Sequence, residues 1–208
     1  MFTRTIFRNA PTIELVDPLA IALGALDRNE AIVYAYEDAV KLAGHSCPAV
    51  SGGFKLVQLA LSQLYPDTTP LRGGIKVKVL GGREHKVNGP ISQIVTLVTG
   101  AASETGFAGL NEGKFSRKNL LVFVEDDSPS PDCVYSAIFE RIDNGRQVKI
   151  TYSNHMLGSK PEMGMLMPKA VSDQASDEEL SRFGDLWHER IETILLDPPE
   201  GMFVVSFE

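Results

Sequence analysis

Apolar residues recur at helical spacing over three long stretches, which predict helices at residues 30–43, 48–64 and about 177–196. Asn29 and Gly44 suit the two ends of the first helix, and Pro48 suits the first position of the second. The apolar stripe of 48–64 is the widest of the three. We therefore expect this helix to lie at the centre of the fold.

Alternating or β-branched apolar runs predict four strands, at residues 74–80, 119–125, 133–142 and 147–152. The last two are joined by residues 143–146, whose Asn-Gly pair is a strong signal for a hairpin. Residues 202–207 could add a closing strand after the final helix. The turn-rich segment 126–132 is expected to be a solvated loop.

The segment 91–100 fits two structures. Its run of β-branched residues favours a strand. Pro90 at a first helical position and Gly100 as a C-terminal stop favour a helix instead. The hydrophobic pattern leaves both alternatives open.

The length of 208 residues indicates one well-cored domain in three parts. Residues 1–28 are expected to form an N-terminal arm, and residues 29–155 the main body. Residues 156–208 would hold a loop rich in methionine and proline and the final helix, packed on the same domain. The methionines of 156–167 suggest a lid or a loop that covers a dimer partner.

Composition excludes several classes of protein. With 43% hydrophobic and 23% charged residues the chain is an ordinary globular protein, and its net charge of −7 argues against nucleic acid as a partner. The apolar stretch 13–26 is interrupted by charge and proline, so we expect neither a secretion signal nor a membrane span. Two cysteines give no disulfide framework, which points to the reducing cytoplasm.

The turn between the first two predicted helices carries the clearest chemistry. His45 and Cys47 lie two residues apart, just before Pro48 opens a helix. A helix N-terminus favours the thiolate form of a cysteine, the form that attacks electrophiles or binds metal. In a tight turn both side chains can reach one ion. The alternative is a buried free cysteine beside a histidine that bonds to backbone.

Four further residues are candidates for the site. Gly52 and Gly53 lie in the first turns of the central helix, where each glycine costs about 1 kcal/mol relative to alanine. Their missing side chains indicate either close approach of a ligand or tight helix packing. His85 lies in the polar segment 81–89, and His155 follows the last hairpin strand; either could reach the His45–Cys47 turn.

The run 44–50, with the long helix behind it, resembles the H-x-C-P-G signature of the FmdE-like family, which takes its name from a component of molybdenum formylmethanofuran dehydrogenase. Residues 94–100 are similar to the family helix that ends in a Thr-Gly pair, and Asn119-Leu120 is similar to the pair that opens its next strand. The resemblance covers roughly residues 30–155.

The resemblance implies an α+β fold, in which a helix, a strand, a second helix and three strands build a mixed sheet. It implies a helix at 91–98, metal binding near His45 and Cys47, and a homodimer. The family's biochemical role outside methanogens is mostly undefined. This chain departs from the pattern at Ala49 (family glycine), at Ala101 (family cysteine), and at Ser92 or Gln93 (family aspartate). It also has no four-cysteine zinc ribbon of the kind that some members carry at the C-terminus.

Three functional hypotheses follow. The first is a metal-binding domain with His45 and Cys47 as ligands and His85 or His155 completing the set, for zinc or else nickel or iron. The second is an accessory domain that binds a small ligand or a protein partner without chemistry of its own. The third is a thiol enzyme with Cys47 as the nucleophile.

Overall fold

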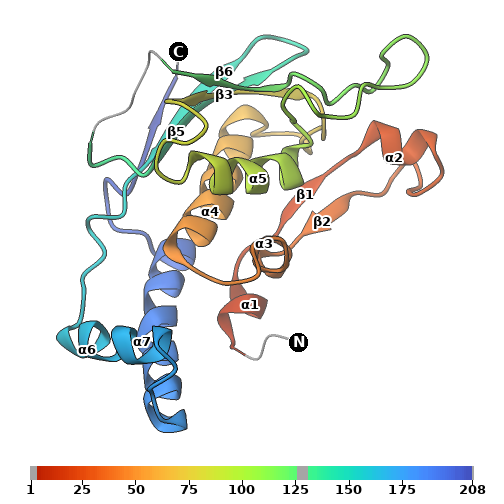
Figure 1. Ribbon diagram of the computed structural model, residues 1–208. Coiled ribbons are helices and arrows are strands. Elements are labelled where there is room, and N and C mark those ends of the chain that lie inside the picture. Colours follow the sequence, from red (N-terminus) through yellow and green to blue (C-terminus); the bar gives the residue numbers. More distant parts are fainter. Residues whose placement is uncertain (1–3, 126–130, 208) are drawn as a thin grey trace.

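The computed structural model describes residues 4–125 and 131–207, so most of the loop expected at 126–132 lies outside the described residues. The fold is α+β, as expected. A mixed five-stranded sheet lies against helices α4 (Pro48–Leu64) and α5 (Asn88–Thr99), and a separate two-stranded sheet lies near the N-terminus (Figure 1). The central helix has the bounds that the sequence predicted.

The large sheet has the strand order β4 (Leu121–Val124), β3 (Ile75–Leu80), β5 (Tyr135–Arg141), β6 (Gln147–Tyr152) and β7 (Phe203–Ser206). Strands β3 and β4 are parallel, and the other neighbours are antiparallel. A parallel pair needs a crossover connection, which α5 supplies. The predicted order of helix, strand, helix and three strands is therefore confirmed, and β7 is the predicted closing strand.

One face of the sheet forms the core with α4. The side chains that alternate along β3, β5 and β6 are fully buried, and they are Ile75, Val77, Val79, Tyr135, Ala137, Phe139, Val148, Ile150 and Tyr152. Burying one large apolar side chain contributes about 1.5–3 kcal/mol, so this contact between helix and sheet is a main source of stability.

The segment 91–98 is helical. Gly100 ends α5 in the left-handed conformation, with φ of 75° and its N–H bonded to the Thr96 carbonyl. Ile91, Ile94 and Val98 are buried along one side of the helix, and α5 packs against α4. This packing outweighs the strand propensity of the β-branched residues.

The predicted helix at 30–43 is wrong in its first half. Residues Ile32–Tyr34 form strand β2, which pairs antiparallel with β1 (Ile13–Leu15), and α3 begins only at Tyr36 and ends at Ala43. The N–H of Ala35 donates to the Asp38 carboxylate at 2.9 Å, which caps the start of the shorter helix. The N-terminal arm adds two short helices, α1 (Ile6–Asn9) and α2 (Pro18–Ala22).

The loop expected over 156–167 is wrong from Pro161 onward, because α6 (Pro161–Val171) is a helix that packs against α7 (Asp177–Leu196). A small apolar cluster of Met163, Leu166 and Leu186 joins the two helices. Figure 1 shows the start of α7 extending with α6 away from the sheet, while the end of α7 lies beside α4.

One hydrophobic core contains residues from all three parts of the chain. Ile6 and Leu15 of the arm and Ile191 and Met202 of the C-terminal part join the side chains of α4 and the sheet. In the part of the chain that is described, no helix has the length and apolar character needed to cross a membrane.

Candidate functional site

The candidate site is built on the turn between α3 and α4. Gly44 ends α3 in the left-handed conformation with φ of 76°, and Cys47 is the extended N-cap residue of α4. Pro48 occupies the first helical position. Cys47 therefore lies at a helix N-terminus, as the sequence predicted.

Three aromatic side chains hold this turn, and we call them the aromatic clamp: Tyr36 of α3, Tyr152 of β6 and Trp187 of α7. The hydroxyl groups of Tyr36 and Ser46 share a hydrogen bond of 2.8 Å. Trp187 Nε1 donates to the Ser46 carbonyl at 2.8 Å, and the Tyr152 hydroxyl donates to the Pro48 carbonyl at 2.9 Å. Elements far apart in the sequence thus fix the backbone on both sides of Cys47.

The two clamp tyrosines are held in their neutral form. Burial raises the pKa of Tyr36 and of Tyr152, and the negative charge of a Cys47 thiolate raises the pKa of both further. Both hydroxyl groups therefore keep their protons at physiological pH, which the hydrogen bond from Tyr152 to the Pro48 carbonyl requires.

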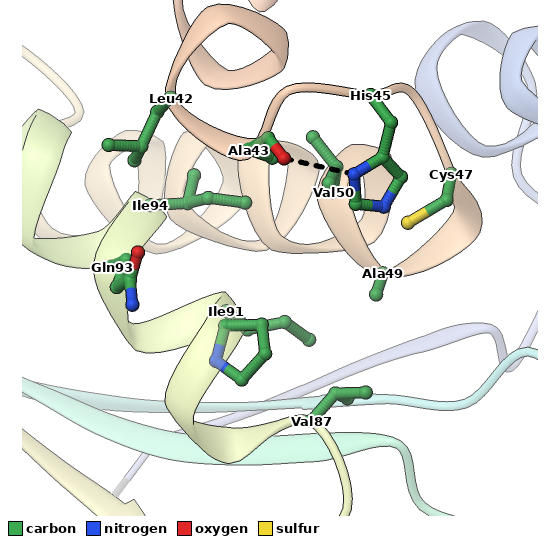
Figure 2. A pocket seen from close by; sticks show the side chains of 11 residues that line it. Leu42, Ala43, His45, Cys47, Ala49, Val50, Val87, Ile91, Gln93 and Ile94 are labelled. Carbon is green, nitrogen blue, oxygen red and sulfur yellow. Dashed lines mark hydrogen bonds between the residues drawn. The ribbon is translucent and has the colours of Figure 1, made fainter.

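The ring of His45 has a defined orientation. Its Nδ1 lies 3.0 Å from the Ala43 carbonyl oxygen, and because a carbonyl only accepts hydrogen bonds, Nδ1 carries a proton. In the neutral ring, Nε2 then keeps its lone pair for a ligand. Figure 2 shows the His45 ring beside Cys47, with Nε2 on the side of the sulfur.

Both side chains line one cavity of about 360 Å³ between the turn and α5 (Figure 2). This volume is in the usual range for small-molecule sites. Among the described residues, Gln93 is the only other polar side chain of the lining. The remaining lining residues are Leu42, Ala43, Ala49, Val50, Val87, Pro90, Ile91 and Ile94. The cavity is thus an apolar chamber with an imidazole and a thiol at one wall.

His85 and His155 do not line this cavity. A tight turn before α5 places the His85 ring against Gly81, where its buried Nε2 has no hydrogen-bond partner in the described part of the chain. His155 is exposed in the connection after β6. Within residues 4–125 and 131–207, no three His, Cys, Asp or Glu side chains come together as metal ligands. One chain therefore brings two of the four predicted ligands together.

Protein side chains fill the space in front of the two glycines of α4. A Cβ atom on Gly52 would overlap the ring of Tyr152, and one on Gly53 would lie 3.1 Å from Ile91 Cγ2 and 3.3 Å from Ile94 Cδ1. Neither glycine lines the cavity. Tight packing of α4 on β6 and α5, the alternative to ligand contact, accounts for both residues.

The positions where the chain departs from the FmdE-like pattern differ in their surroundings. Ala101 is fully buried, and it lines neither this cavity nor the neighbouring cavity along α5. The Ser92 hydroxyl shares a hydrogen bond of 3.1 Å with the buried Tyr135 hydroxyl. Gln93 is exposed and faces the cavity. Of the departing positions, Gln93 and Ala49 line the cavity.

Trp187 has a role that sequence reasoning missed. The apolar pattern assigned it to the buried side of the last helix, but its N–H bond to Ser46 joins residues 141 positions apart. No local signal marks such a contact.

Replacing Trp187 with phenylalanine is expected to destabilise the protein by about 1–2 kcal/mol, since the Ser46 carbonyl loses its donor while most of the ring packing is kept. Amide hydrogen exchange of residues 44–51 should accelerate together with this loss. Phe183→Leu is the control, because it removes the ring that contacts Trp187 and leaves the hydrogen bond in place. Equal exchange in the two variants would show that Trp187 does not hold the turn.

The structure is thus an α+β domain with a helix-lined cavity of about 360 Å³ beside the His45–Cys47 turn. No protein-family model matches the chain, and no curated protein matches its sequence. The resemblance to the FmdE-like family therefore rests on the residues of the turn, of α5 and of the Asn119-Leu120 pair alone.

Proposed function

We propose that this chain is an FmdE-like domain that binds a small ligand in the α4–α5 cavity through a divalent transition metal held by His45 and Cys47. The observation that supports the proposal is the orientation of His45. Its Nδ1 bonds to the Ala43 carbonyl, and its Nε2 lies with Cys47 on the cavity. Metal-binding histidines usually donate their other ring N–H to a carbonyl or carboxylate in this way.

The donor types favour zinc. An imidazole nitrogen and a thiolate are its usual protein ligands, and nickel or iron are the next most suitable metals. Two protein donors leave coordination positions for water, for atoms of the bound ligand, or for a second copy of the chain. A homodimer in the reducing cytoplasm, where Cys47 stays a thiol, is part of the proposal.

Removing either donor is expected to weaken zinc binding at least tenfold, since each supplies half of the protein ligands. The test compares Cys47→Ser and His45→Ala with the parent protein, using competition with a chromophoric chelator and elemental analysis. His155→Ala is the matched control, because this histidine is exposed and does not line the cavity. Equally weak zinc binding by parent and variants would refute the proposal.

A second candidate is a metal-free binding domain of the accessory type. The apolar lining of the cavity favours it, because such a chamber can take up a ligand by burial of apolar surface alone. Ligand binding that persists unchanged after chelator treatment would favour this candidate over the first. Thiol catalysis by Cys47 stays a prediction, and the pH dependence of its alkylation tests it.

A further inference from the structure

A second cavity of about 490 Å³ adjoins the first along α5. Leu42 and Gln93 line both. The second cavity also reaches Ser103 and Thr105 of the loop after α5 and Phe123 of β4. The two cavities therefore lie end to end, with Gln93 at the boundary between them.

The two cavities differ in chemistry. Four residues with hydroxyl side chains, Ser92, Thr96, Ser103 and Thr105, line the second cavity, and none lines the first. The Ser92 and Thr96 hydroxyls bond within the protein. Those of Ser103 and Thr105 share an exposed hydrogen bond, so they are the ones that can meet a ligand. A ligand that filled both would need an apolar end and a polar end.

The charges around the second cavity favour a ligand whose polar end is uncharged. Arg83 is the charged residue in the described lining of the second cavity, and its Nη2 contacts both carboxylate oxygens of Glu104 at 3.0 Å. The guanidinium carbon of Arg83 lies 5.4 Å from the centre of the Phe123 ring. Glu104 lies outside this lining but pairs with Arg83, so the charge of Arg83 already has a carboxylate partner and does not call for an anionic ligand.

Gln93 is placed to recognise this end. Its side chain is exposed, and among the described residues its amide has no hydrogen-bond partner. A carboxamide offers two donors and one acceptor oxygen, so it can bond to a group of similar kind.

We propose that the ligand is an elongated small molecule with an apolar end in the first cavity and an uncharged hydrogen-bonding end, such as a carboxamide, in the second, and that Gln93 selects for that end. This inference rests on the ligand-binding part of the proposed function and does not depend on the metal.

Disulfide-linked probes can test the inference in chelator-treated protein. Cys47 lines the first cavity, whereas Cys133 is only 2% exposed and is protected from reagents. The probes are mixed disulfides of cysteamine with N-acyl cysteamines. Their acyl chains vary in length and end either in a carboxamide or in an isopropyl group of similar shape. The Cys47 thiolate attacks the probe disulfide, the acyl cysteamine becomes disulfide-bonded to Cys47, and cysteamine leaves as the thiol.

Mass spectrometry of the intact protein at fixed 2-mercaptoethanol measures how much of each probe is retained. For chains long enough to reach Gln93, the carboxamide probe should be retained about threefold to tenfold better than its isopropyl counterpart, the effect of one hydrogen bond. Gln93→Leu should abolish this preference and leave short alkyl probes unaffected. Gln174→Leu, an exposed glutamine outside both cavities, is the control and should keep the preference.

Two results would overturn the inference, and they have different meanings. If short alkyl probes are retained but the carboxamide preference is missing, or survives in Gln93→Leu, the inference fails and the proposed function stands. If no acyl probe is retained better than cysteamine itself, the first cavity takes no ligand, and the ligand-binding function fails with it.

Discussion

Replacing Asp17 with asparagine is expected to lower the free energy of unfolding by about 3–5 kcal/mol, the usual effect of breaking a buried ion pair. Asp17 is 3% exposed, and its carboxylate accepts hydrogen bonds from Arg72 at 3.0 Å and Arg117 at 2.7 Å. The N–H groups of Leu19 and Ala20 donate to the same side chain. The asparagine variant would leave two arginines, one of them buried, without this compensating charge.

The same substitution should change how stability depends on pH. Burial by itself raises the pKa of Asp17, but the Arg72 hydrogen bond, the Arg117 charge and the two amides outweigh it, so the pKa lies below its ordinary value of 3.8. The ionised form therefore stabilises the fold. This contribution is fully present above the unfolded-state pKa and is lost as the pH falls through the lower folded-state pKa. The parent protein should lose this contribution on acidification, and Asp17→Asn should not.

Urea unfolding at neutral pH and at decreasing pH measures both effects. Asp143→Asn is the matched control, because Asp143 pairs with Arg141 at the surface, where an ion pair contributes little. If the two variants lose the same stability at neutral pH, Asp17 is not the compensating charge of the arginine pair.

Replacing Gly52 with alanine is expected to destabilise the protein by about 3 kcal/mol, at the upper end of the usual range for overpacking. The new Cβ would overlap atoms Cε1 and Cζ of Tyr152. That ring has little freedom to move, since it stacks on the Phe203 ring with 4.9 Å between the ring centres, and its hydroxyl donates to the Pro48 carbonyl. The gain in helix propensity, about 1 kcal/mol, only partly offsets the clash.

Gly164→Ala in α6 provides the matched control for this substitution. Apart from its chain neighbours and the backbone of α6 itself, no atom of the described residues lies within 4 Å of the Cβ that it would add. Helix propensity alone should therefore act, and stability should rise by up to about 1 kcal/mol. Thermal or urea unfolding compares the two variants. If the Gly52→Ala protein is as stable as the parent, α4 and β6 can move apart without loss of stability. That result would contradict the role of Tyr152 in the aromatic clamp.

The features that the sequence predicted correctly have local causes. Gly44 and Pro48 set the ends of two helices, because a left-handed stop and a fixed φ act within one or two residues. The hairpin at residues 143–146 and the alternation of β3 are similarly local. The placement of Cys47 at the start of α4 followed from these signals alone.

The features that were predicted wrongly depend on distant partners. Residues 30–35 match a helical spacing, yet Ile32–Tyr34 pair with Ile13–Leu15, a contact that the spacing does not encode. The prolines of the Met-rich tract suggested a loop. Pro161 instead begins α6, and Pro168 is tolerated inside this helix, which α7 supports through an apolar cluster.

The sequence by itself determined the central helix and the position of an imidazole and a thiol at its start, because short-range backbone preferences and apolar periodicity control these features. The α+β class was predicted from the resemblance to the FmdE-like family. Only the tertiary structure decided what surrounds them. It placed Trp187 and Tyr152 on the turn, placed Gln93 between two cavities, and kept His85 and His155 away from the first cavity. Such contacts depend on how helices and strands pack against one another, and residues 104 and 141 positions apart along the chain show no shared pattern before they meet.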